Sequence, residues 1–180
     1  TVAIVLALAI CTGLVHVFLM PPFQNPDEVQ HYLLCASHAY NRQDMEQVET
    51  DVLKAMKKHK WFHFVGIGPG WENTKKISDV SFVFHFDSNR KSNRNTIFHF
   101  LYGKILSISG IRNALTGFYF LRIVSTFIYA GFIFFAFLFF RVYFFQIRYH
   151  LLAGLLLIFQ FATIMNAVNY DVFMVLLGSV

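Results

Sequence analysis

The stretch VAIVLALAICTGLVHVFLM, residues 2–20, decides the fold. About 19 consecutive apolar or weakly polar residues form a helix long enough to cross a bilayer core of roughly 30 Å. Only the hinge Pro21-Pro22-Phe23-Gln24 separates this stretch from the acidic sequence Asn25-Pro26-Asp27-Glu28. The two adjacent carboxylates are therefore expected at the membrane–water interface, where an enzyme acting on a lipid-linked substrate would keep a catalytic acid or base.

The composition predicts an integral membrane protein of the all-α class, a polytopic transmembrane helical bundle. Of the 180 residues, 56% are hydrophobic and only 14% are charged, whereas a soluble domain carries roughly 25% charged residues. The net charge of +5 suits a membrane protein that handles phosphate-bearing lipids, and it does not point to nucleic acid. Because the chain begins at Thr1 and stops at Val180 inside an apolar run, we expect it to be the N-terminal piece of a longer protein.

Apolar runs divide the chain into membrane spans around one long loop. Residues 21–95, about 75 in all, are too charged to lie in the membrane and are expected to hold helices of their own, because structureless loops of that length are unusual. The expected segments are a first span over 1–20, an external loop over 21–113, a second span over 114–140, a third over 151–166 and the start of a fourth over 169–180.

Three helices are predicted within the loop. Residues 26–40 and 45–58 form the first two, and the second carries Val48, Val52, Ala55 and Met56 on one face. Residues 97–109 form a third, apolar helix that is too short to cross a bilayer and is expected to lie on the membrane surface. The aromatic clusters at 61–64 and 82–86 predict either a short hairpin or an interfacial aromatic patch.

The placement of basic residues predicts the orientation. Arg141, Arg148 and His150 lie in the short turn between the second and third spans, which is therefore expected to be cytoplasmic. The long loop is then external. Counting the spans also places Asp171, at the start of the fourth span, on the same external side of the membrane as Asp27 and Glu28.

A purely structural explanation of the acidic motif must be set beside the catalytic one. Asn25 is a favoured N-cap, Pro26 suits the first helical position, and Asp27 and Glu28 suit the next two. These residues would start a helix through His31 whether or not they had a chemical role. A capped helix is also a rigid platform for a carboxylate, so the two explanations are compatible.

Four motifs occur in order along the chain. They are Pro-Pro-Phe-Gln-Asn-Pro-Asp-Glu-Val-Gln-His-Tyr from Pro21, Ile-Phe-His-Phe-Leu-Tyr from Ile97, Tyr-Phe-Leu-Arg from Tyr119 and Asn-Tyr-Asp from Asn169. This ordered set resembles the GT-C superfamily of polytopic membrane glycosyltransferases. More closely, the chain is similar to a bacterial family of multispanning membrane proteins with an N-terminal Pro-Asp-Glu-x-x-His motif and no assigned reaction. Relatives often carry proline ahead of the helix that here follows Thr96.

The resemblance implies a sugar donor linked to a polyprenyl phosphate or diphosphate and a glycan or lipid acceptor. It also implies that Asp27, with Glu28 as its neighbour, lies near the acceptor as the catalytic carboxylate. Glycosyl transfer to a hydroxyl needs a base for the departing proton, while the lipid phosphate leaving group needs cationic partners. Arg122 is expected either to contact that phosphate or to pair with Asp171 or Asp27, since an arginine inside a span is costly without a partner.

Other candidates surround this core. Asp27 and His31 have i, i+4 spacing on one helical face, so His31 could orient the carboxylate, help Asp27 with Glu28 or Asp171 to hold a divalent metal ion, or form an incidental surface pair. No cofactor is required beyond that possible ion. Three further residues flank the short apolar helix and either bind substrate or extend towards water as the snorkelling alternative: Arg94, His99 and Lys104.

Three functions follow from these patterns. The favoured one is a membrane glycosyltransferase that builds or decorates a cell-surface polysaccharide from a lipid-linked sugar. A transporter or flippase would use Asp27, Arg122 and Asp171 as a charge relay, but broken helices and midplane charges would be expected there. A non-catalytic membrane scaffold is the third.

Overall fold

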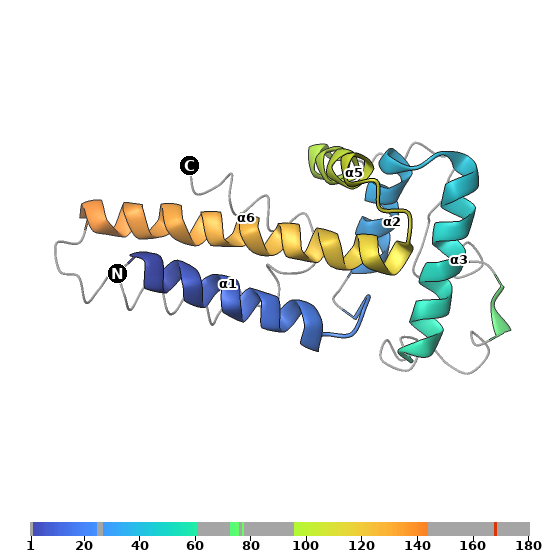
Figure 1. Ribbon diagram of the computed structural model, residues 1–180, viewed down its shortest axis with the longest axis horizontal. Coiled ribbons are helices and arrows are strands. Elements are labelled where there is room, and N and C mark those ends of the chain that lie inside the picture. The colour runs from blue at the N-terminus through green and yellow to red at the C-terminus, as the bar shows by residue number, and fades with distance from the viewer. Residues whose placement is uncertain are drawn as a thin grey trace. The chain divides into compact units, whose positions relative to one another are not determined.

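The computed structural model describes residues 2–24, 27–60, 73–75, 77, 96–143 and 168. These residues form helices and no strand, which confirms the all-α class for this part of the chain (Figure 1). The helices are α1 (Val2–Leu19), α2 (Glu28–Ala39), α3 (Arg42–Lys58), α5 (Ile97–Ser109) and α6 (Ala114–Tyr143). The chain divides into two compact units, one of Thr1–Met20 with Phe120–Val180 and one of Pro21–Tyr119.

Several sequence predictions fall outside the described residues. They are the third and fourth spans over 151–166 and 169–180, the aromatic clusters at 61–64 and 82–86, and the basic residues Arg148 and His150 of the predicted cytoplasmic turn. They remain predictions.

Helices α1 and α6 are long and apolar enough to cross a membrane. In the most apolar 18-residue stretch of each helix, only 22% of α1 and 39% of α6 is buried. The core helix of a soluble protein would be mostly buried, so the exposed apolar surface of both helices suits contact with lipid.

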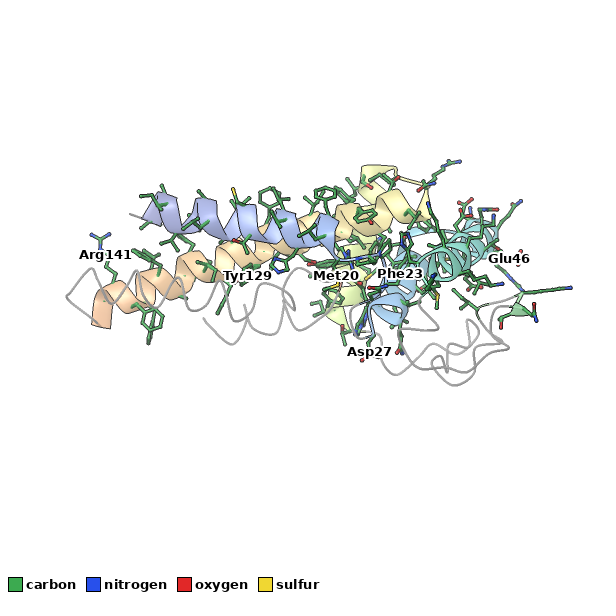
Figure 2. All side chains as sticks on the ribbon, turned by 90° about the horizontal axis from the view of Figure 1, so that it is seen from below. Met20, Phe23, Asp27, Glu46, Tyr129 and Arg141 are labelled. Carbon is green, nitrogen blue, oxygen red and sulfur yellow. The ribbon has the colours of Figure 1, made fainter. Side chains whose placement is uncertain are left out.

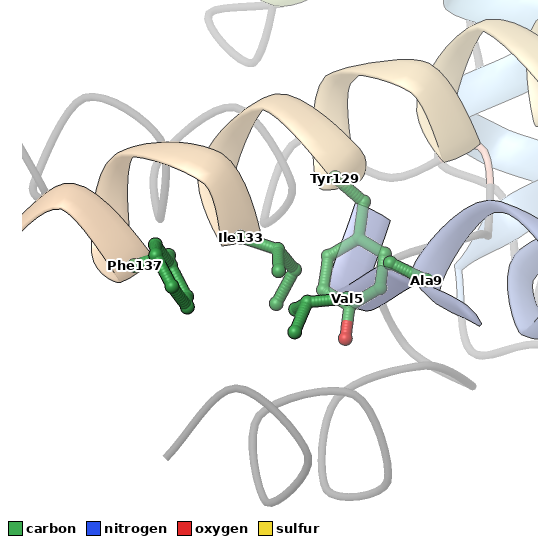
Figure 3. Close-up of a cluster of buried hydrophobic side chains, with 5 residues drawn as sticks. All are labelled: Val5, Ala9, Tyr129, Ile133 and Phe137. Atoms are coloured by element: carbon green, nitrogen blue, oxygen red, sulfur yellow. The ribbon is translucent and has the colours of Figure 1, made fainter. Parts of the chain in front are cut away.

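Side chains of α1 and α6 meet in a buried apolar cluster of Val5, Ala9, Tyr129, Ile133 and Phe137 (Figure 3). Small residues on α1 face large ones on α6, so the aromatic and branched side chains of α6 fill the space that alanine and valine leave. The cluster comes from the first half of α1 and the second half of α6. The two helices therefore run antiparallel.

In the unit Pro21–Tyr119, α2 is the central helix and packs against both α5 and α3. Its buried residues lie on almost every side of the helix, from Glu28 to Ala36. An all-round buried helix needs partners for its polar side chains as well as for its apolar ones. The requirement is unusual here because α2 carries a glutamate and two histidines.

Helix α3 follows its sequence pattern closely. Asn41 caps it by accepting a hydrogen bond from the backbone N–H of Asp44 at 2.9 Å, so the helix begins at Arg42, three residues before the predicted start. Its apolar face buries Val48, Val52, Leu53, Ala55 and Met56. Most of its other residues are charged or polar, as the amphipathic pattern predicts.

Helix α5 approaches α2 closely at Gly103. A β-carbon added to Gly103 would lie 2.5 Å from Cβ of His38 and 2.6 Å from the backbone oxygen of Cys35. No real side chain fits in that space, so glycine sets the separation of the two helices. The close approach determines which side chains of α2 and α5 can touch.

The connection from α5 to α6 is fastened to α2. Gly110 ends α5 in the left-handed conformation, with φ of 67°. Asn113 then accepts a hydrogen bond from the Thr116 N–H at 3.0 Å and caps α6. The Tyr32 hydroxyl donates to the carbonyl of Ala114 at 2.7 Å, and the Tyr40 hydroxyl donates to the carbonyl of Ile111.

Candidate functional site

The acidic motif starts helix α2 differently from the capping arrangement described above. The helix begins at Glu28 and its N-cap is Asp27, so the expectation that Asn25 caps a helix with Pro26 at its first position is wrong. The physical reason is the backbone of Asp27, whose φ of 57° is left-handed and cannot continue a right-handed helix. Asn25 and Pro26 themselves lie outside the described residues.

Asp27 is exposed, and its side chain makes no capping hydrogen bond to the helix that it starts (Figure 2). A left-handed residue other than glycine is uncommon, although aspartate tolerates this region better than most residues, and it costs about 1 kcal/mol or more. Strained residues of this kind concentrate at functional sites. The carboxylate is therefore exposed to solvent at a left-handed turn and does not cap α2 through a side-chain hydrogen bond.

Glu28 occupies the opposite environment from its neighbour. It is 0% exposed at the first position of α2. The positive end of the helix dipole favours a carboxylate at that position, and a buried carboxylate needs hydrogen-bonding partners. Two adjacent carboxylates thus differ sharply in access to solvent, and the exposed Asp27 is the better placed of the two to meet a substrate.

Behind the start of α2 lies a pair of histidines from two helices. His31 is 8% exposed and His99 of α5 is 1% exposed. Nδ1 of His31 lies 2.9 Å from Nε2 of His99, and the two rings are 17° from parallel. The pair brings together two residues that the sequence analysis assigned to separate roles, one catalytic and one substrate-binding.

His99 is also tied to the start of its own helix. Its Nδ1 accepts a hydrogen bond from the backbone N–H of Thr96 at 3.1 Å. This is the place that glutamate or glutamine takes in a capping box, three residues after a Ser or Thr N-cap. Burial, and then the neighbouring His31 and His38, lower the pKa of His99 to about 4, so the ring is neutral near pH 7.

His38 is a third histidine on α2 that the sequence analysis did not assign to the site. Its Nε2 is buried without a hydrogen-bond partner among the residues that the structure describes. Its ring lies edge-on to Phe100, 6.0 Å between centroids. The signal in the sequence was the seven-residue spacing of His31 and His38, which places both side chains on one face of a helix.

Arg122 makes contacts within the other unit. Its Nη1 donates to the carbonyl of Val17 at 3.1 Å and to that of Met20 at 2.7 Å, and the residue is 1% exposed. These carbonyls belong to the end of α1, where a cation complements the helix dipole and unpaired backbone oxygens. The expected contact with a lipid phosphate remains a prediction, and pairing with Asp171 falls outside the described residues.

No protein-family model, curated protein or solved structure matches this chain. The functional argument therefore depends on the geometry of the site and on the motifs of the sequence.

The remaining candidates are less closely tied to this site. Lys104 is exposed, with its Nζ 5.6 Å from the centroid of the Phe100 ring, a cation–π contact. Arg94 lies outside the described residues. Within the described ranges, no group of three or more His, Cys, Asp or Glu side chains is arranged to hold a metal ion. The predicted ion shared by Asp27 and Asp171 is untested, because Asp171 lies beyond those ranges.

Proposed function

We propose that the chain is the N-terminal module of a membrane glycosyltransferase that uses a polyprenyl-phosphate-linked sugar. Asp27 is the general base that takes the proton of the acceptor hydroxyl as the glycosidic bond forms. The lipid phosphate leaves with the electron pair of the bond that breaks, so the leaving group needs cationic contacts and no protonating acid. The product is a cell-surface glycan made at the external face of a bacterial plasma membrane.

The environment of Asp27 is the observation that carries this proposal. The carboxylate is exposed, held by a left-handed turn and not engaged in capping α2. It follows an apolar helix with only the residues 20–26 between. A base must be reachable, fixed in place and available to accept a proton, and Asp27 meets these requirements better than the buried Glu28.

The substitution Asp27→Asn tests the assignment. Asparagine keeps the volume and also tolerates the left-handed conformation, but its amide cannot take the proton. Turnover with a polyprenyl-phosphate sugar donor should fall by about 10²–10⁴, the usual contribution of a positioned base, while the melting temperature stays unchanged. The matched control is Glu28→Gln, which alters the buried neighbour and should lower stability more than Asp27→Asn does.

Full activity of Asp27→Asn at unchanged stability would remove Asp27 from the mechanism. Absence of turnover in the wild-type protein with any lipid-linked sugar would instead favour the transporter or the scaffold.

The orientation is tested separately. Single cysteines at Ser88 and Gln146, in a chain without Cys11 and Cys35, are treated with a membrane-impermeant thiol reagent on intact cells. Labelling is expected at position 88 and not at position 146, since the short basic turn belongs inside. The opposite pattern would place Asp27 on the cytoplasmic side and contradict the external active face.

A further inference from the structure

The hydrogen bonds around His99 determine which of its ring nitrogens carries a proton. A backbone N–H can only donate, so Nδ1 of His99, which accepts from Thr96 at 3.1 Å, bears a lone pair. The Thr96 hydroxyl oxygen lies 3.0 Å from the same nitrogen and is placed to donate as well. The proton of neutral His99 is therefore on Nε2.

The protonation of His99 determines which nitrogen of His31 carries a proton, because the two rings are in hydrogen-bond contact. Nε2 of His99 is 2.9 Å from Nδ1 of His31. Since Nε2–H of His99 is a donor, Nδ1 of His31 must accept and cannot carry a proton. Neutral His31 then has its proton on Nε2, the ring nitrogen on the side away from His99.

We propose that His99 is a positioning residue that fixes His31 as an Nε2–H donor to an anionic oxygen at the start of α2. This inference rests on the proposed function and deepens it. It makes His31 the group that orients an anion and leaves proton abstraction to Asp27. The anionic oxygen belongs either to the carboxylate of Asp27, one helical turn before His31, or to the phosphate of the bound lipid.

The surroundings of the pair support a fixed tautomer. The groups around the pair include His38 of α2, Thr96 at the start of α5 and Phe98, whose ring is edge-on to His31 at 6.3 Å. The low pKa of His99 keeps that ring neutral through the ordinary pH range, so Nε2 of His99 remains the donor and Nδ1 of His31 the acceptor. The buried position of both rings prevents water from replacing either partner.

Long-range ¹⁵N–¹H spectra of histidine-labelled full chain in detergent test the tautomer directly. The His31 signals, assigned by comparison with His31→Asn, should show a protonated Nε2 and an unprotonated Nδ1. A protonated Nδ1 on His31 in the wild-type protein would overturn the proposal, whether or not the chain is a glycosyltransferase.

Two substitutions at His99 separate positioning from packing. His99→Gln keeps the capping-box contact with Thr96 and offers an amide N–H to His31, so the Nε2–H tautomer should persist. His99→Glu also accepts from Thr96 but has only acceptors, so His31 should take a proton on Nδ1. Retention of an unprotonated Nδ1 in a folded His99→Glu protein would contradict the positioning role.

Catalysis should follow the tautomer. We expect His99→Gln to keep kcat within a few-fold of wild type and His99→Glu to lose about ten- to a hundred-fold in kcat, the size of effect found when the partner that orients a metal-ligating histidine is removed. KM for the acceptor should stay nearly unchanged in both, as expected for an interaction used in the reaction step. Equal losses in the two variants would indicate a packing role and reject the proposal.

The same spectra identify the anionic oxygen. A shift of the His31 Nε2–H signal in Asp27→Asn without lipid assigns the carboxylate, and a shift only on addition of polyprenyl phosphate assigns the phosphate. A signal that moves in neither experiment would refute the donor role of His31.

Discussion

The two compact units bury side chains of different chemistry. The α1–α6 cluster is built from aliphatic and aromatic side chains, while both helices leave large residues such as Ile4, Phe18 and Phe139 exposed. The unit Pro21–Tyr119 instead buries a glutamate, two histidines and tyrosines with hydrogen-bond partners. The α1–α6 unit also buries Arg122, but that side chain is satisfied by backbone carbonyls at the end of α1, whereas the polar core of the loop unit depends on pairings between side chains of different helices.

The largest expected difference between the units is their response to acid. Acid should destabilise the loop unit, because its ionisable core includes His99. The pKa of His99 is lowered to about 4 from an ordinary 6.5, so the unfolded chain binds a proton that the folded chain excludes. Above about pH 6.5, His99 leaves the free energy of unfolding independent of pH. As the pH falls from 6.5 towards 4, His99 lowers the free energy of unfolding. At about 1.4 kcal/mol per pKa unit, the loss is on the order of 2–3 kcal/mol.

The measurement is the free energy of unfolding of wild type and of His99→Gln between pH 7.5 and pH 4. The difference between the two proteins isolates the contribution of His99 from those of the groups that both proteins share. A difference that stays constant over this range would show that His99 does not exclude the proton.

Replacing one glycine in each unit by alanine tests how closely the helices of each unit are packed. Gly103→Ala places a methyl group against the backbone of Cys35 and the side chain of His38, and should cost about 2 kcal/mol or more by overpacking. Gly131→Ala in α6 meets nothing within 4 Å, and should stabilise that helix by up to about 1 kcal/mol. Denaturation of both variants beside wild type checks the prediction, and equal effects would mean that α2 and α5 are not held at the separation described.

The smallest expected effect concerns a single hydrogen bond. Burial raises the pKa of Tyr32, which keeps the hydroxyl protonated as the donor to Ala114. Tyr32→Phe should cost about 1 kcal/mol in unfolding free energy, the typical net value of one such bond. Tyr40→Phe, at a half-buried position, is the control and should cost less. A larger loss for Tyr40→Phe would identify the Ile111 contact as the main tie to the α5–α6 connection.

The helices with one dominant sequence pattern were predicted best. The apolar run at the N-terminus, the amphipathic face of α3 and the short helix Ile97–Ser109 all appear close to their expected bounds. The start of α2 was predicted poorly, because Asn25-Pro26-Asp27-Glu28 satisfies ordinary capping preferences at one position while the structure places the N-cap two residues later, at Asp27. Local preferences differ there by less than the packing of α2 contributes.

The sequence by itself determined that this chain is helical, where its apolar helices lie and which residue types could carry chemistry. Hydrophobic periodicity and length are local properties, so they can be derived without knowing any contact. Only the tertiary structure decided that Asp27 is exposed while Glu28 is buried, and that His31 meets His99 across 68 residues of chain. Those outcomes depend on the close approach of α5 to α2 at Gly103, and a contact between distant segments leaves no periodic trace in the sequence.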